Sequence, residues 1–333
     1  RLPAGTDGRR RRPMRPVDPA GTLWPAERVP HVEMPTSLTA AADPETLPPD
    51  VPGESTFVEV NGRTFHVVEA GPDDGDLVLL LHGFPEFWYG WHDQIRPLVN
   101  EGYRVVVPDQ RGYNRSERPG HVRDYRIEAL SADVTGLIDA YDRETAAVVG
   151  HDWGGVVGWW TALHAPERLS SFVPVNAPHP TVIRRTLSGD PVQILRSSYA
   201  LFFQVPKVPE ALTRAANWRL PMRMMRESSM PGTFSTADFD RYRAAWGREG
   251  AFTAMLNWYR AAARRRPTPE TDEVTVPTRL IWGVHDQFLK HRMAYDSVDY
   301  CVDGRVTNVH EATHWVQHEQ PVKVADAILE ELS

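Results

Sequence analysis

An aspartate between two glycines, where an apolar strand pattern meets a helical one, is the residue best placed for chemistry in this sequence. Residues 148–156 read VVGHDWGGV, and Asp152 is the acidic residue among them. Gly-x-Asp-x-Gly at such a junction is typical of a nucleophile elbow, a sharp turn that presents one side chain above a sheet. Because a carboxylate needs no base to deprotonate it, Asp152 is predicted to be a covalent nucleophile that attacks carbon directly. The alternative is a loop aspartate that only caps the following helix.

A second acidic residue and a histidine follow two later strand patterns. Asp286 comes after the apolar run 280–282, and His314 comes after the last predicted strand, at 304–309. Their separation of 28 residues leaves room for one helix and one strand between two neighbouring strand ends. The chain order nucleophile, acid, histidine is that of a hydrolase triad, in which His314 would activate water and Asp286 would orient the imidazole. His318, a turn further on, is the alternative histidine.

The elements that must position these residues alternate along the chain from about residue 55. Asn61-Gly62 between two alternating segments predicts a β-hairpin. Continuous apolar runs predict buried strands at residues 78–81, 105–107, 147–149, 172–175, 280–282 and 304–309. Helical spacing of apolar residues predicts helices at 127–138, 156–164 and 321–332, with Val322 facing inward in the last one. This alternation predicts an α/β fold with a mostly parallel central sheet and helices on both faces.

The alternation stops between residues 180 and 268, where the sequence is helical in character and rich in Arg, Met and Trp. Ser235 followed by Asp238 predicts a capping box at the start of one helix in this stretch. We therefore expect a helical cap over residues 180–268. It would be inserted into an α/β core formed by residues 54–179 and 269–333.

The N-terminal stretch, residues 1–53, has a different composition. It holds eleven of the 29 prolines, lacks periodicity and carries the basic run Arg9–Arg12. We expect a poorly ordered arm here. No apolar segment follows the basic run, so no signal peptide is predicted, and Met14 is an alternative start of the natural chain.

Composition excludes several classes of function. The net charge of -7, from 37 basic and 44 acidic residues, argues against a nucleic-acid partner. Cys301 is the only cysteine, so neither an intrachain disulfide nor a thiolate metal site is expected, and the composition suits a reducing, cytoplasmic location. No apolar run reaches the roughly 18 residues of a membrane helix, so no membrane partner is expected. The oligomeric state is left open, a homodimer included.

Residues 55–330 resemble the epoxide hydrolases of the α/β-hydrolase fold. Residues 80–86, LLHGFPE, are similar to the oxyanion loop of that superfamily, and residues 109–116, DQRGYNRS, to another shared segment. The resemblance implies that the backbone N–H groups of Phe84 and Trp153 stabilise a developing oxyanion. It also implies a cis peptide bond before Pro85.

The resemblance extends to the cap. Residues 198–206 and 256–260 are similar to the segments that carry two catalytic tyrosines in those enzymes, which implies that role for Tyr199 and Tyr259. A neutral phenol, with a pKa near 10, can donate a proton to the oxygen of an opening epoxide. The alternative is that both tyrosines are packing residues of the cap. The residues expected to contact the substrate are Phe84, Pro85, Trp153 and Trp258.

The resemblance therefore implies hydrolysis of a small, apolar epoxide by water to a vicinal diol, through an ester on Asp152 and without a metal or other cofactor. A haloalkane dehalogenase is the alternative enzyme, since it shares the aspartate and the following Trp153. Many such enzymes have Asn or Glu where this chain has Phe84, and they lack the acid that an alkoxide requires. A third possibility is a non-catalytic ligand-binding protein on the same fold, although none of its five catalytic side chains is missing.

Overall fold

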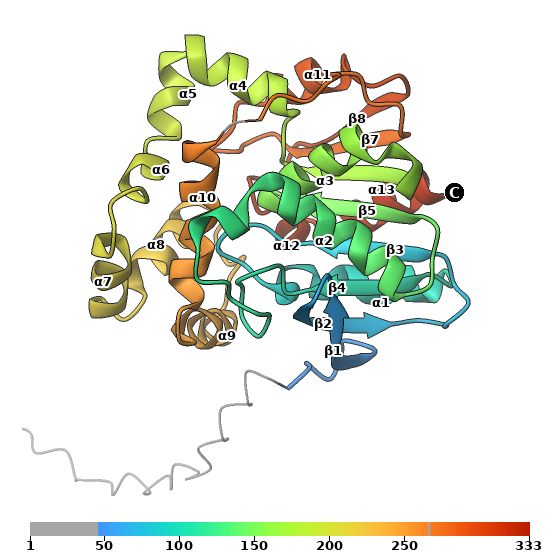
Figure 1. Cartoon of the computed structure of the whole chain (residues 1–333), viewed down its shortest axis with the longest axis horizontal. Helices are drawn as coiled ribbons and strands as arrows, with labels where there is room; N and C mark the ends of the chain where they lie inside the picture. The colour runs from blue at the N-terminus through green and yellow to red at the C-terminus, as the bar shows by residue number, and fades with distance from the viewer. Residues whose placement is uncertain (1–45, 266) are drawn as a thin grey trace, which may run out of the picture. The chain divides into compact units, whose positions relative to one another are not determined.

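The computed structural model describes residues 46–265 and 267–333. Within this part of the chain, eight strands form one sheet in the order β1-β2-β4-β3-β5-β6-β7-β8 (Figure 1). The strands are β1 (Glu54–Val60), β2 (Arg63–Ala70), β3 (Leu77–Leu81), β4 (Arg104–Pro108), β5 (Ala146–His151), β6 (Leu169–Val175), β7 (Thr278–Gly283) and β8 (Gly304–Val309). Only β1 with β2, and β2 with β4, pair in antiparallel fashion. The mostly parallel sheet predicted from the sequence is confirmed.

The hairpin and the central strands form for the reasons that their sequences suggest. Asn61 and Gly62, between β1 and β2, have φ angles of 52° and 70°, the left-handed conformation that a tight two-residue hairpin turn requires. All five residues of β3 and all six of β5 are buried. Their apolar runs therefore reflect burial on both faces, as parallel central strands require.

Helices cover the sheet and extend beyond it. The helices are α1 (His92–Asn100), α2 (Ile127–Ala140), α3 (Trp153–His164), α4 (Pro180–Gly189), α5 (Pro191–Arg196), α6 (Tyr199–Phe202), α7 (Val208–Ala215), α8 (Arg219–Ser228), α9 (Thr236–Gly247), α10 (Ala251–Arg264), α11 (Arg292–Val298), α12 (Val316–Glu319) and α13 (Pro321–Leu332). Helix α1 packs against α13, and α2 packs against α3. The two pairs lie on opposite faces of the sheet (Figure 1). No helix of the described residues is long and apolar enough to cross a membrane.

Helices α4 to α10 lie between β6 and β7 in the chain and to one side of the sheet (Figure 1). The predicted capping box is present at α9, where the Ser235 hydroxyl accepts from the Asp238 N–H and the Asp238 carboxylate accepts from the Ser235 N–H. In α10, ten of the fourteen residues are buried, which makes it the internal helix of this region.

Two expectations from the sequence require correction. Residues 1–45 of the expected arm lie outside the described residues, but residues 46–53 pack against the core: Val51 is buried, and the Arg96 guanidinium donates to the Asp50 carbonyl at 2.7 Å. Val322, expected to face inward, is 70% exposed. It lies in the first turn of α13, whose buried side begins only at Val324.

Candidate active site

Asp152 occupies the turn between β5 and α3. Its φ angle of 49° is in the left-handed region, which is strained for a residue with a Cβ. The positions of Gly150 and Gly154 leave no room for a side chain. A Cβ on Gly154 would lie 2.2 Å from the Leu81 carbonyl oxygen, and one on Gly150 would lie 2.5 Å from the Gly154 backbone. The turn therefore holds the Asp152 carboxylate at the N-terminus of α3, where the helix dipole favours negative charge.

The predicted acid and histidine lie beside this aspartate. Asp286 follows β7, and His314 follows the neighbouring strand β8. The His314 Nδ1–H donates to Asp286 Oδ2 at 2.8 Å, and His314 Nε2 is 3.8 Å from Asp152 Oδ2. His318, the alternative histidine, instead bonds to the buried Glu86 at 2.6 Å. The geometry therefore selects His314.

Besides the hydrogen bond from His314, three others hold the carboxylate of Asp286. It accepts from Asn176 Nδ2 at 2.6 Å and from the backbone N–H groups of Phe288 and Leu289 at 2.7 and 2.9 Å. Burial raises its pKa, but the attraction of His314 and these hydrogen bonds outweigh burial and leave the pKa below its ordinary value. Sequence reasoning missed Asn176, although its place directly after β6, at the same edge of the sheet, was the available signal.

His314 is buried, which by itself would lower its pKa. The neighbouring carboxylates outweigh that effect, first Asp286 and then Asp152, and raise the pKa of His314 from 6.5 to about 9. The imidazole is therefore protonated at neutral pH. Removing the charge of Asp152 removes one of the interactions that favour the protonated form.

The loop after β3 brings one of the two expected oxyanion donors to the aspartate. The Phe84 N–H donates to Asp152 Oδ1 at 2.9 Å, and the expected cis peptide bond before Pro85 is present. Trp153 is the first residue of α3, where backbone N–H groups have no partner within the helix. The Phe84 N–H therefore contacts the carboxylate of Asp152, and the oxyanion role of the Trp153 N–H stays a prediction.

Tyr199 and Tyr259 come from different helices, α6 and α10, but line one cavity together with Asp152. Their ring centroids are 6.1 Å apart. Burial is the largest cause that raises the pKa of each phenol, and the negative charge of Asp152 raises both further. Both hydroxyl groups therefore remain protonated and able to donate.

The walls of this cavity are largely aromatic and apolar. Its lining residues are Phe84, Asp152, Tyr199, Met224, Tyr259, Phe288, His314 and Trp315. Sequence reasoning missed Met224, Phe288 and Trp315; the last two directly follow the acid and histidine motifs, but Met224 of α8 carries no sequence signal.

Three of the residues expected to bind substrate do not belong to this lining. Trp258 is 1% exposed, and its indole N–H donates to the Arg111 carbonyl at 3.0 Å. The ring of Trp153 makes edge contacts with Trp258 and with Tyr259. The Pro85 carbonyl accepts from the indole of Trp246 at 2.6 Å. Trp153 and Trp258 therefore pack next to Tyr259, which does line the cavity, rather than lining it themselves.

A buried carboxylate connects the oxyanion loop, the histidine loop and α9. Glu86 is 1% exposed and accepts hydrogen bonds from His151 at 3.0 Å, His318 at 2.6 Å, Tyr242 at 2.8 Å and Gln317 at 3.0 Å. Burial raises its pKa, but His318 and His151 outweigh burial and lower it. The second nitrogen of His151 bonds to the His314 carbonyl at 2.9 Å, so this network fixes the backbone of the predicted catalytic residue His314.

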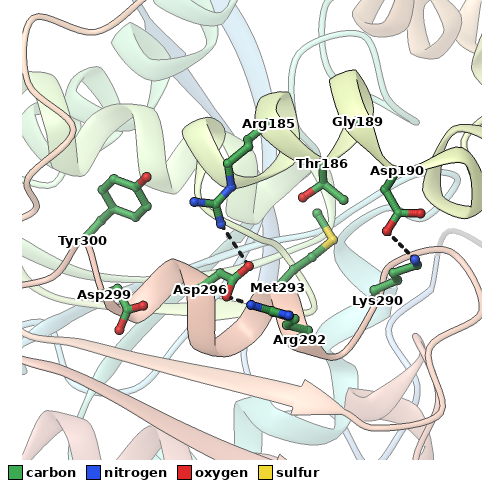
Figure 2. A pocket seen from close by; sticks show the side chains of 10 residues that line it. All are labelled: Arg185, Thr186, Gly189, Asp190, Lys290, Arg292, Met293, Asp296, Asp299 and Tyr300. Atoms are coloured by element: carbon green, nitrogen blue, oxygen red, sulfur yellow. Dashed lines mark hydrogen bonds and ion pairs between the residues drawn. The ribbon is translucent and has the colours of Figure 1, made fainter.

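A larger cavity, of about 590 Å³, lies between α4 and α11 (Figure 2). Charged side chains line it and pair with one another: Arg185 with Asp296 at 2.9 Å, and Lys290 with Asp190. None of the predicted site residues reaches it. Among the described residues, no group of three His, Cys, Asp or Glu side chains is placed to hold a metal ion.

Comparisons with known proteins agree with this geometry. Residues 76–321 match the family described as alpha/beta hydrolase fold. The chain is 46% identical over 276 residues to the AB hydrolase superfamily protein YfhM of Bacillus subtilis, covering 83% of this chain and 96% of that protein. It is 33% identical to epoxide hydrolase A of Mycobacterium tuberculosis, covering 83% and 96%. The crystal structure of an epoxide hydrolase from Bacillus megaterium aligns with a TM-score of 0.76 at 29% identity, covering 83% of this chain and 99% of that one.

Fold and comparisons together define a hydrolase, and the turn between its β5 and α3 carries an aspartate. The chain belongs to the alpha/beta hydrolase fold family, and its homologues include epoxide hydrolases.

Proposed function

We propose that this protein is an epoxide hydrolase that converts an apolar epoxide and water to a vicinal diol. The observation that carries the proposal is the pair of protonated tyrosines, Tyr199 and Tyr259, on the same cavity as Asp152. An opening epoxide needs a nucleophile at carbon and an acid at oxygen, and this cavity offers both. Similar proteins named epoxide hydrolases support the same conclusion.

In the first step, the epoxide oxygen accepts hydrogen bonds from Tyr199 and Tyr259. A carboxylate oxygen of Asp152 attacks one ring carbon, the carbon–oxygen bond of the ring breaks, and a tyrosine gives its proton to the departing oxygen. The product is an ester between Asp152 and the alcohol, and the phenolate regains a proton from solvent.

In the second step, the ester is hydrolysed. Ester formation neutralises Asp152, which removes one of the charges that keep the pKa of His314 high and favours the neutral base. His314, oriented by Asp286, takes a proton from water, and the hydroxide attacks the carboxyl carbon of Asp152. The N–H groups of Phe84 and Trp153 stabilise the resulting oxyanion. The bond from that carbon to the diol oxygen then breaks, the departing oxygen takes the proton from His314, and the Asp152 carboxylate is restored. Each step uses groups of this chain, so the proposal requires no metal or cofactor.

The cavity also indicates the kind of substrate. Phe84, Phe288, Met224 and Trp315 give it apolar walls, which favour an apolar substituent on the epoxide.

A substrate panel tests this proposal. Purified protein is incubated with aryl, alkyl and bulky epoxides and, in parallel, with haloalkanes, and diol and halide are measured. We expect diol from at least one epoxide, no halide, and neither product from the Asp152→Ala variant. Halide release without any diol would instead establish a dehalogenase.

A further inference from the structure

A serine, a histidine and an aspartate form a second hydrogen-bonded chain, away from Asp152. The Ser55 hydroxyl lies 2.7 Å from His66 Nε2, and His66 Nδ1 lies 2.6 Å from Asp109 Oδ2. Ser55 is on β1, the edge strand, whereas Asp152 follows β5, the fifth strand in the sheet order. With neighbouring strands about 4.8 Å apart, four strand spacings separate the two groups by roughly 19 Å.

The buried carboxylate of Asp109 sets the direction of these hydrogen bonds. Asp109 has no exposed surface, and its carboxylate also accepts from the Trp88 N–H at 3.1 Å and from Asn114 Nδ2 at 2.8 Å. Burial raises its pKa, but His66 and these hydrogen bonds outweigh burial and lower it. Because a carboxylate only accepts, His66 donates to Asp109 from Nδ1, and its Nε2 faces the hydroxyl of Ser55.

The serine end of this hydrogen-bonded group is open to solvent, and the positively charged Arg115 lies beside it. Ser55 is exposed, while His66 is 1% exposed. A guanidinium nitrogen of Arg115 lies 3.2 Å from Ser55 Oγ and 3.3 Å from His66 Nε2. The same guanidinium lies over the ring of Phe57, 4.8 Å from its centre, which helps to fix its position. A cation at this distance stabilises negative charge that develops on an oxygen.

We propose that Ser55 is a second nucleophile, which accepts the acyl group of small activated esters with His66 as the base and Asp109 as the group that orients it. Ser55 Oγ attacks the acyl carbon while its proton moves to His66 Nε2. The bond from the acyl carbon to the leaving oxygen then breaks, and the leaving group takes the proton from His66. Arg115 stabilises the oxyanion. The serine is on an open strand, so short acyl groups are the expected donors.

The test uses the full chain with Asp152→Ala, which removes the main nucleophile. The protein is treated with p-nitrophenyl acetate, and acetylated residues are located and timed by peptide mass spectrometry. Ser188, also exposed, donates its hydroxyl to the Arg184 carbonyl and is the internal reference. We expect Ser55 to be acetylated at least about 10-fold faster than Ser188, since positioned base catalysis typically contributes 10²–10⁴-fold.

Two further variants keep the result decisive. Adding Ser55→Ala should reduce p-nitrophenol release to the background of the remaining residues. Ser55→Cys should create a thiol that reacts with iodoacetamide faster than Cys301, which is half-buried and whose pKa is raised by burial. Equal acetylation of Ser55 and Ser188, or unchanged release after Ser55→Ala, would show that the three residues only anchor the edge strand. Thermal melts confirm that each variant is folded.

Discussion

At the scale of single residues, the proposed reaction depends on a carboxylate and on phenols that keep their protons. Asp152 is the proposed nucleophile, and burial together with the charge of Asp152 raises the pKa of the phenols of Tyr199 and Tyr259. The charge of Asp152 also contributes to the raised pKa of His314, and that contribution ends when the ester forms. The pKa values of the two tyrosines and of His314 therefore all depend on the charge of Asp152.

The tyrosines should be partly redundant as acids. We expect Tyr199→Phe or Tyr259→Phe to slow ester formation about 10- to 100-fold and the double change more than about 1000-fold, since a general acid contributes 10²–10⁴-fold. Stopped-flow tryptophan fluorescence can follow the step, because Trp153 and Trp315 lie at the site. Tyr295→Phe is the control, since that exposed ring interacts with Asn308 away from the cavity. Full activity of the double variant would refute the assigned role.

The raised pKa of His314 makes stability depend on pH. The folded protein holds this proton more tightly than the unfolded chain, so the stabilisation is complete below pH 6.5 and is lost as the pH rises to about 9 and beyond. At about 1.4 kcal/mol per pKa unit, His314 accounts for a loss of about 3 kcal/mol. Urea unfolding from pH 6 to 10 measures it. The His314→Gln variant should show a shallower decline, and parallel curves would contradict the assignment.

Sequence reasoning located the residues that belong to local motifs. Asp152 is marked by its glycines, and Asp286 and His314 by the strands before them. Met224 was missed because its role arises only when separate segments meet, whereas Asn176 was missed although it directly follows β6. Trp258 was misplaced because an aromatic residue beside Tyr259 in a helix must point in another direction, here towards the Arg111 carbonyl.

At the scale of elements, the decisive feature is the turn from β5 to α3. Gly154→Ala should destabilise the protein by about 3 kcal/mol or more, because its Cβ would collide with the Leu81 carbonyl on the neighbouring strand. Gly189→Ala, at the end of α4, is the matched control, since nothing lies within 4 Å of its Cβ, and should change stability by less than about 1 kcal/mol. Thermal and urea unfolding compare them; equal effects would mean that the elbow is not sterically restricted.

The predictable elements were those with strong periodicity. Strands buried on both faces and the helices α2, α3 and α13 follow from their apolar patterns. Helix α1 was missed because Pro97 lies inside it, and α5 and α6 are too short for a helical period to emerge.

At the scale of the whole described molecule, α9 and α10 are tied to the core beside the site. The Tyr242 hydroxyl donates to Glu86, and the indole of Trp246 donates to the Pro85 carbonyl, so α9 contacts the loop that also provides the Phe84 N–H. These contacts could not be predicted from the sequence, because they join residues about 160 positions apart. In α10, the indole of Trp258 donates to the Arg111 carbonyl, so this helix is also bonded to the core.

The central claim is that Asp152 becomes an ester, and isotope labelling tests it most directly. Excess enzyme is allowed one turnover of an epoxide in ¹⁸O-water, and the peptide that contains Asp152 and the diol are analysed by mass spectrometry. Because water attacks the carboxyl carbon, the account predicts ¹⁸O in the Asp152 carboxylate and an unlabelled first diol. Label in the first diol with an unlabelled Asp152 would contradict it, since water would then have opened the epoxide directly.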